Sequence, residues 1–271
     1  MAGYVCTIAG GKGGVGKTTT AVNVGAGLQE LGYDVAVVDA DLGMANLGSM
    51  LAVEPQRSVH DILSGEAAVS EALTDAPGGL TVIAGEQSLD AFADADPAKL
   101  RKVIKTLRAA YDVVIIDTGA GLSHEVAVPL GLADGIVLVT TPDEVAVGDT
   151  VKTAQLADRI DGAVIGGIIT RVTRHTDVAD INDRLEFPLL AVIPDDPQAT
   201  HEEPLVHNEP DSPAADAYLR LTDALEGVFF EGDTAEADLE TIVDDSWFVD
   251  EDAEADDTEE EGSGGVFGLF N

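Results

Sequence analysis

Short apolar runs alternate along the chain with longer stretches in which apolar residues recur at helical spacing, up to about residue 225. The runs have the length and composition of buried strands, and the stretches between them are long enough for helices. The predicted strands are residues 4–9, 34–39, 80–84, 112–117, 135–140, 163–170 and 188–193. The predicted helices are residues 18–31, 58–65, 97–110, 145–160, 178–185 and 213–225. This alternation predicts an α/β fold with a doubly wound, mainly parallel sheet and ligands at the carboxyl ends of its strands.

The pattern changes after residue 230. Residues 231–261 hold sixteen acidic residues, with no Lys or Arg after Arg220, and residues 262–265 are Gly-Ser-Gly-Gly. Such a segment repels itself and buries little apolar surface. We therefore predict one folded domain over residues 1–230, a disordered acidic linker over 231–265 and a short apolar motif, Val-Phe-Gly-Leu-Phe-Asn, at 266–271.

A glycine-rich stretch lies between the first predicted strand and the first predicted helix. It matches G-x-x-x-x-G-K-[ST], the phosphate-binding loop (P-loop), in which backbone N–H groups and a lysine bind nucleotide phosphates. Because spacing and strand–helix context agree, an ordinary glycine-rich turn is the weaker interpretation. Thr18 supplies a hydroxyl for Mg²⁺. The predicted nucleotide-binding residues of this loop are Gly11, Lys12, Gly13, Gly14, Val15, Gly16, Lys17, Thr18 and Thr19.

Three acids follow apolar strands that end near the loop. Asp117 ends a fully apolar run, where its carboxylate can hold the Mg²⁺ shell directly or through a water molecule. Asp39 and Asp41 follow another strand, and from their position one could bind a magnesium water while the other orients the attacking water. Two acids in one loop are common in proteins of many kinds, but beside a P-loop we interpret them as functional.

The net charge of −37 is extreme. Outside residues 231–261 the chain keeps 35 acids against 14 bases, a balance of −21, so nucleic acid is not an expected partner. The excess of acids suggests a high-salt cytoplasm, in which self-repulsion is screened. The single cysteine, Cys6, excludes an intramolecular disulfide and is expected to pack in the core. Without a long apolar run or a signal-peptide pattern, a cytoplasmic location is expected.

Three motifs together resemble one family. Residues 12–19 resemble the deviant Walker A motif of the MinD/ParA family of P-loop ATPases, and residues 38–43 and 115–121 resemble its next two motifs. The similarity runs over about residues 3–227. Iron–sulfur members need several cysteines and DNA-segregating members need a basic surface, so the chain is identified as a MinD-like member, from a halophilic archaeon.

The resemblance implies ATP and Mg²⁺ as cofactors and a homodimer in the ATP state, with nucleotide held between the subunits. Lys12 would cross to the other subunit's phosphates, and Asn46 would lie near the dimer interface. Lys17 and Thr18 would serve the phosphates and Mg²⁺ in the same subunit. Asp41 would hold the water, and Asp39 and Asp117 the metal shell. The expected adenine contacts are Thr170, Arg171, Pro194 and Asp195.

Two positions depart from the family pattern. Gly119 stands where the family usually has proline after the strand acid, so the loop there could be more flexible. The family often has asparagine–arginine where this chain has Thr170-Arg171, which weakens the inference about adenine contacts.

The function expected from the resemblance is that of an ATP-dependent positioning ATPase that localises a division site, a motility apparatus or a chemosensory array. Hydrolysis would be stimulated by a partner or a membrane, and residues 266–271 would dock on one of these. The expected location therefore includes peripheral attachment at the cytoplasmic face of the membrane, if the motif docks on lipid. Two alternatives are a P-loop ligase that activates a small molecule with ATP and a nucleotide-binding scaffold that does not hydrolyse.

Overall fold

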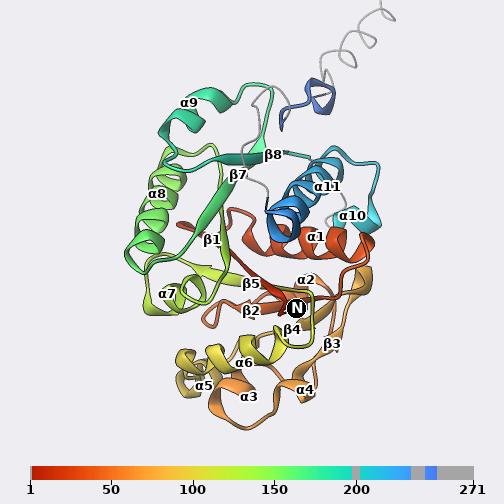
Figure 1. Ribbon diagram of the computed structural model, residues 1–271, viewed down its shortest axis with the longest axis vertical. Helices are drawn as coiled ribbons and strands as arrows, with labels where there is room; N and C mark the ends of the chain where they lie inside the picture. Colours follow the sequence, from red (N-terminus) through yellow and green to blue (C-terminus); the bar gives the residue numbers. More distant parts are fainter. Residues whose placement is uncertain (1, 197–201, 233–241, 249–271) are drawn as a thin grey trace, which may run out of the picture.

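The computed structural model describes residues 2–196, 202–232 and 242–248. Within them, eight strands form one sheet in the order β3-β4-β2-β5-β1-β6-β7-β8 (Figure 1). All neighbouring pairs are parallel except β3 with β4. The strands are β1 (Tyr4–Gly10), β2 (Val35–Ala40), β3 (Thr74–Asp75), β4 (Thr81–Ile83), β5 (Val113–Ala120), β6 (Gly135–Thr140), β7 (Val164–Val172) and β8 (Leu189–Pro194).

Helices connect these strands. The α-helices are α1 (Lys17–Glu30), α2 (Leu47–Met50), α3 (Val59–Ser64), α4 (Val69–Ala72), α5 (Leu89–Asp94), α6 (Leu100–Leu107), α7 (His124–Leu130), α8 (Glu144–Arg159), α9 (Val178–Arg184), α10 (Leu205–Asn208) and α11 (Pro213–Glu226). Short 3-10 turns cover Pro77–Gly79, Pro97–Lys99 and Asp245–Trp247, and a π-helical turn covers Gly227–Glu231.

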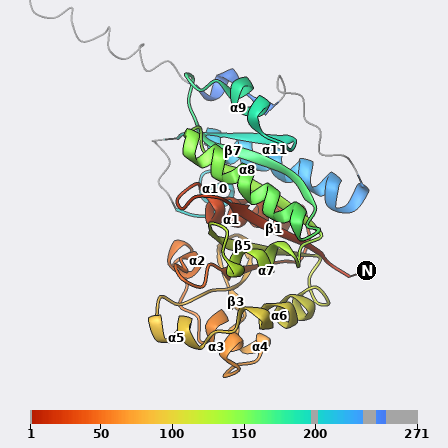
Figure 2. The same cartoon turned by 90° about the vertical axis from the view of Figure 1, so that its left-hand side faces the viewer.

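The sheet is buried on both faces because its strands are apolar at successive positions. In β5, Val113 and Ile115 belong to the apolar cluster on one face, whereas Val114 and Ile116 belong to the cluster on the other. Alternate side chains of a strand point to opposite faces, so both faces need helices to cover them. Helices α1, α10 and α11 cover the first face; α3, α6, α7 and α8 cover the second, with α7 and α8 in front in Figure 2.

The predicted fold class is confirmed, and each predicted strand and helix is present with small shifts at its ends. Several short elements were not predicted: α2, α4, α5, α7, α10 and β3. Most are too short to show a period, and α7 contains Pro129, which disfavours a helix by local propensity. Packing of Val126 and Leu130 against the sheet holds α7 in place.

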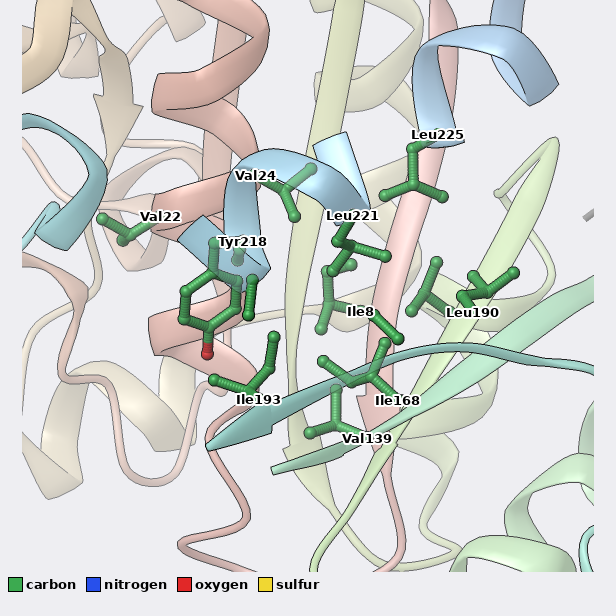
Figure 3. Close-up of a cluster of buried hydrophobic side chains, with 14 of the residues drawn as sticks. Ile8, Val22, Val24, Val139, Ile168, Leu190, Ile193, Tyr218, Leu221 and Leu225 are labelled. Carbon is green, nitrogen blue, oxygen red and sulfur yellow. The ribbon is translucent and has the colours of Figure 1, made fainter. Parts of the chain in front are cut away.

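The first face packs most closely where α1 crosses α11. Figure 3 shows Tyr218, Leu221 and Leu225 of α11 among Ile8 of β1 and Leu190 of β8. A Cβ atom at Gly27 of α1 would lie 2.6 Å from the Thr222 hydroxyl oxygen, so the two helices approach as closely as a glycine allows.

The chain after α11 departs from the expectation for residues 231–265. Residues 242–248 pack against the domain, and Ile242 and Trp247 join the apolar cluster of the first face. The acidic composition predicted a linker here, but burial of two large apolar side chains against the domain is favourable and holds this segment in place. The remaining tail, including the motif at 266–271, lies outside the described residues, and the domain boundary at residue 230 stays a prediction. No helix within the described ranges is long and apolar enough to cross a membrane.

The contact between Gly27 and Thr222 yields a stability prediction. Gly27→Ala should lower the free energy of unfolding by about 1–3 kcal/mol, because the new methyl group overpacks the α1–α11 contact. In a Thr222→Ala background the same change should be neutral or stabilising, since alanine is the better helix former by about 1 kcal/mol. Urea denaturation of the four proteins in this double-mutant cycle measures the coupling. Additive effects of the two substitutions would contradict the close contact.

Candidate functional site

The P-loop connects β1 to α1 at the centre of the sheet, where β1 lies between β5 and β6. Gly16 precedes α1 with φ 94°, a left-handed conformation that glycine adopts without strain. No side chain caps this helix end, so its first N–H groups are available to an anion. The Lys17 side chain is buried, and burial lowers its pKa against the opposing effects of Asp117 and Asp41.

Two side chains from β7 hold the P-loop from one side. The Thr170 hydroxyl lies 2.8 Å from the carbonyl oxygen of Val15 and donates to it. The Arg171 guanidinium donates to the carbonyl oxygen of Gly14 at 2.7 Å, and Arg171 itself has φ 56°, a strained conformation for a residue with a Cβ. Both residues therefore support the loop backbone; their predicted adenine contacts stay a prediction.

Pro194 and Asp195, the other predicted adenine contacts, lie at the carboxyl end of β8. Pro194 is paired with Val172 of β7, and the Asp195 N–H donates to the Val172 carbonyl oxygen at 2.8 Å. This places them at the edge of the sheet that carries the P-loop, next to the end of β7. Their role also stays a prediction.

Asp117 and Thr18 meet beneath the P-loop. The Thr18 hydroxyl lies 2.6 Å from Asp117 Oδ2 and 3.0 Å from Asn46 Oδ1. Asp117 Oδ1 is the one buried side-chain polar atom, among those of the described residues, that has no hydrogen-bond partner. A buried carboxylate oxygen with a free lone pair, next to a threonine hydroxyl, is a donor set that suits Mg²⁺. The residues present thus fit the predicted metal.

Asp39 uses both carboxylate oxygens to hold the loop that follows β2. Its Oδ1 accepts from the Asp41 N–H at 3.2 Å, and its Oδ2 accepts from the N–H groups of Asn46 and Leu47 at 3.1 and 3.2 Å. Asp39 is also directly opposite Asp117 in the β2–β5 pairing. The two predicted metal-shell acids are therefore neighbours, and one of them organises the loop that carries Asp41.

Electrostatics makes this acid pair costly without a cation. Asp39 and Asp117 are both fully buried. Burial raises the pKa of each carboxyl, and the negative charge of Asp39 raises the pKa of Asp117 further. The hydrogen bond from Thr18 and the charge of Lys17 act in the opposite direction on Asp117. A divalent cation would stabilise the ionised form of the pair.

Asp41 is positioned by backbone contacts and by Gly119. Its Oδ1 accepts from the Met44 N–H at 3.0 Å, and a Cβ atom at Gly119 would lie 3.1 Å from the same oxygen. The glycine at the position where the family usually has proline therefore leaves room for the Asp41 carboxylate at the end of β5.

Lys12 contacts a residue that sequence reasoning did not identify. Its ammonium nitrogen lies 3.0 Å from Asp143 Oδ1 at the surface, with both side chains about half exposed. Asp143 also caps α8 through the N–H of Ala146, and the hydrogen bond from Lys12 lowers its pKa. The sequence carries a signal for the cap, an acid just before a helix, but none for the ion pair with a residue 131 positions away.

Two further features lie beside the site: the buried His60 side chain and a cavity next to Asn46. His60, buried beneath the loop, lies with Nε2 2.9 Å from the Leu42 carbonyl oxygen, and its Nδ1 accepts from the Glu86 N–H at 3.3 Å. The imidazole of His60 thus links the loop after β2 to the loop after β4. A cavity of about 410 Å³ lies next to Asn46, lined in part by Glu54, Arg57 and Glu86.

The fold and the site define the chain as a P-loop protein of the doubly wound α/β class. A family model described as an AAA domain matches residues 3–161. The chain is 36% identical over 232 residues to an uncharacterized ATP-binding protein of Methanocaldococcus jannaschii, covering 83% of this chain and 88% of the relative. It is 32% identical over 238 residues to the septum site-determining protein MinD of a Synechocystis species, covering 82% and 89%. It is 34% identical over 145 residues to the flagellum site-determining protein YlxH of Helicobacter pylori, covering 52% and 49%.

Solved structures agree with these sequence matches. MinD of Pyrococcus horikoshii in complex with Mg-ADP has a TM-score of 0.79 and 32% identity, covering 85% of this chain and 98% of that one. Cobyrinic acid a,c-diamide synthase of Mycobacterium smegmatis, with bound ADP and magnesium, has a TM-score of 0.72 and 26% identity, covering 87% and 99%. The chain belongs to the MinD/ParA family, as its three motifs indicated.

The buried acid pair predicts how stability depends on pH without metal. A carboxyl whose folded-state pKa is raised contributes stability at low pH that is lost as pH rises through that pKa. The free energy of unfolding of the metal-free protein should therefore fall as pH rises above the ordinary carboxyl range. Asp117→Asn, which cannot ionise, should flatten this fall and stabilise the metal-free protein at neutral pH by on the order of 1–3 kcal/mol.

Denaturant titrations in EDTA at several pH values measure this effect. Asp158→Asn, at an exposed position of α8, is the matched control and should leave the pH dependence unchanged. The same Asp117→Asn variant should lose the stabilisation that Mg²⁺ with nucleotide gives the wild type. An Asp117→Asn protein that is less stable than the wild type in EDTA at neutral pH would contradict the assignment.

Proposed function

We propose that this chain is an ATP-dependent positioning ATPase that dimerises around ATP and Mg²⁺ and releases its cargo or surface after hydrolysis. The observation that carries the proposal is the placement of Lys12. Its ammonium group pairs with Asp143 at the surface, while Lys17 is the lysine buried at the base of the loop. We propose that this exposed lysine reaches a nucleotide held by a second subunit.

The surface around the P-loop supports an interface there. Of the seven exposed large apolar residues in the described chain, five follow the carboxyl ends of β2, β4, β5 and β6. Because carboxyl ends of parallel strands share one edge of the sheet, these residues follow the same edge that carries the P-loop. They are Met44, Leu89, Phe92, Leu122 and Val145. A second copy that buries them would exclude water from the nucleotide.

Each residue of the site has a proposed role in ATP hydrolysis. Lys17 and the N–H groups at the start of α1 would bind the phosphates in the same subunit. Thr18, Asp39 and Asp117 would hold Mg²⁺ directly or through water, which supplies charge neutralisation at the phosphates. Asp41, the first residue of the loop that Asp39 anchors, would orient the attacking water. Lys12 of the second subunit would stabilise the charge that develops at the transferring phosphoryl group.

The relatives support positioning as the purpose of this ATPase. The MinD and YlxH relatives are site-determining proteins of the septum and the flagellum. We propose the same kind of role here, with hydrolysis stimulated by a partner or a membrane and with residues 266–271 as the docking motif. The strongly acidic composition makes nucleic acid an unsuitable surface, and the protein would act in the cytoplasm, at the membrane where the motif engages lipid.

One observation favours a ligase as the second candidate. The cobyrinic acid a,c-diamide synthase has a similar fold, and this chain has a cavity beside Asn46 that could take a second substrate. The cavity lining is unsuited to a carboxylic acid, however, because Glu54 and Glu86 repel it and Arg57 is already paired with Asp61. Nucleotide turnover that required an added acid and yielded an amide product would favour this candidate.

Removal of Lys12 tests the dimer directly. Wild-type protein with Mg²⁺ and a slowly hydrolysed ATP analogue should dimerise, and Lys12→Ala should stay monomeric because the partner's phosphates lose their counter-charge. Asp143→Asn keeps a cap for α8 but removes the charge that holds Lys12. Each exposed ion pair contributes about 1 kcal/mol or less, and the dimer releases two of them, one in each subunit. Asp143→Asn should therefore strengthen dimerisation by no more than roughly thirtyfold.

Light scattering after gel filtration measures both effects. Lys152→Ala is the matched control, because Lys152 is also an exposed lysine paired with an aspartate, Asp149, but belongs to α8. It should behave as the wild type. Equal dimerisation of the wild type and Lys12→Ala would exclude the shared site.

The positioning role is tested in cells. A fluorescent fusion of the full chain should gather at discrete positions. Lys12→Ala, which prevents dimerisation, should make it diffuse, whereas Asp41→Ala, which slows hydrolysis, should fix it at its sites. Loss of residues 262–271 should release it from them. Lys152→Ala should match the wild type, and a diffuse signal for the full wild-type chain would contradict positioning.

A further inference from the structure

A groove between β8 and α11 holds residues 242–248. Ile242 and Trp247 are each only 9% exposed in it. The indole N–H of Trp247 donates to Asp216 Oδ2 at 3.0 Å, and the Arg220 guanidinium carbon lies 5.1 Å from the centre of the indole ring. The tryptophan is thus held both by a hydrogen bond and by a cation–π contact.

Arg220 of α11 forms two ion pairs, one of which links this segment to the helix. It lies 2.9 Å from Asp216 of its own helix and 2.9 Å from Asp244 of the segment. Asp244 in turn accepts from the N–H and the hydroxyl of Ser246. These contacts orient the turn that carries Trp247, so the indole stays at one end of the groove.

The groove is not filled by this segment. A cavity of about 310 Å³ remains beside the indole ring. Its lining is mostly apolar and comes from three elements, with Arg220 and Asp223 of α11 also at its wall. The apolar side chains include Leu190 and Val192 of β8, Ala217 and Leu221 of α11, and Ile242 and Trp247 of the segment. An engineered apolar cavity of about 150 Å³ is enough to bind benzene, so this one can accept an aromatic side chain with room to spare.

The same chain supplies a segment of matching chemistry. After Val249, the next large apolar residues are those of the motif at 266–271, which contains Val266, Phe267, Leu269 and Phe270. Between them, residues 250–265 are acids, Ala, Thr, Gly and Ser, which the cavity would not retain. The seventeen residues from 249 to 265 can span at most about 60 Å, so the motif can reach back to the cavity beside Trp247.

We propose that residues 266–271 dock within their own chain, with a phenylalanine side chain in the cavity beside Trp247. A tether of this length presents the motif at an effective concentration of about millimolar order, which suffices for a weak apolar contact. Burial of one or two aromatic side chains gives weak affinity, so docked and free forms coexist.

The docked form has a functional consequence that rests on the proposed function. A motif held in the cavity is unavailable to a membrane or a partner, and a partner must compete with the cavity for it. The cavity thus competes with a membrane or a partner for the motif, and Trp247 forms one wall of the cavity. The docking itself is independent of ATP, so it can be tested without nucleotide.

Trp247 is the only tryptophan in the chain, so its fluorescence reports on the cavity. In nucleotide-free protein, a chain ending at Gly265 should show about twofold stronger acrylamide quenching than the full chain, because the docked population is lost. Phe267→Ser with Phe270→Ser in the full chain should give the same increase. Ala217→Leu, which fills the cavity from α11, should make full and shortened chains alike.

A synthetic peptide of residues 262–271 keeps the test independent of how these variants fold. Added at millimolar concentration to the shortened chain, it should restore the protection, and a peptide with both phenylalanines replaced by serine should not. Equal quenching of full and shortened chains, together with no effect of the peptide, would overturn the proposal. Protection that grows with protein concentration would show docking between copies and would overturn docking within one chain.

Discussion

The buried pair of carboxylates, Asp39 and Asp117, is the constraint on which the site depends. Parallel pairing of β2 with β5 puts them opposite each other, and both are closed off from water. Two buried like charges are unfavourable unless a cation or a proton compensates them. The pair also holds two segments at the end of the sheet: Asp117 contacts the start of α1 through Thr18, and Asp39 holds the loop that carries Asp41. Any change of charge at the pair would thus reach both the P-loop and this loop.

Lys12, unlike these buried acids, lies at the surface with its side chain about half exposed. Lys17 loses its hydration inside the protein, whereas Lys12 keeps its ammonium group in water beside Asp143. A surface ion pair of this kind is weak, so little energy is needed to redirect the lysine to another anion. One loop therefore presents two lysines in different environments, one fixed at its base and one available at the surface. The apolar side chains around the loop would add the burial that two isolated charges cannot supply.

The tail shows how local composition and packing can disagree. The acidic composition of residues 231–261 disfavours burial, yet Ile242 and Trp247 bury their side chains against β8 and α11. β8 is the last strand of the sheet, and the segment covers apolar surface there that would otherwise be exposed. The contacts of Arg220 with Asp216 and Asp244 place an ion-paired cation in a strongly acidic region.

Residue patterns alone predicted the doubly wound sheet, its main strands and helices, the P-loop and the acids Asp39, Asp41 and Asp117, because each follows from a local period or a short motif. The contacts that hold the site together lay beyond such reasoning. Lys12 meets Asp143 across 131 positions, and Arg171 meets Gly14 across 157. Single residues carry no signal of such partners. Their distances depend on strand order and register, which arise only when both faces of the sheet are buried together.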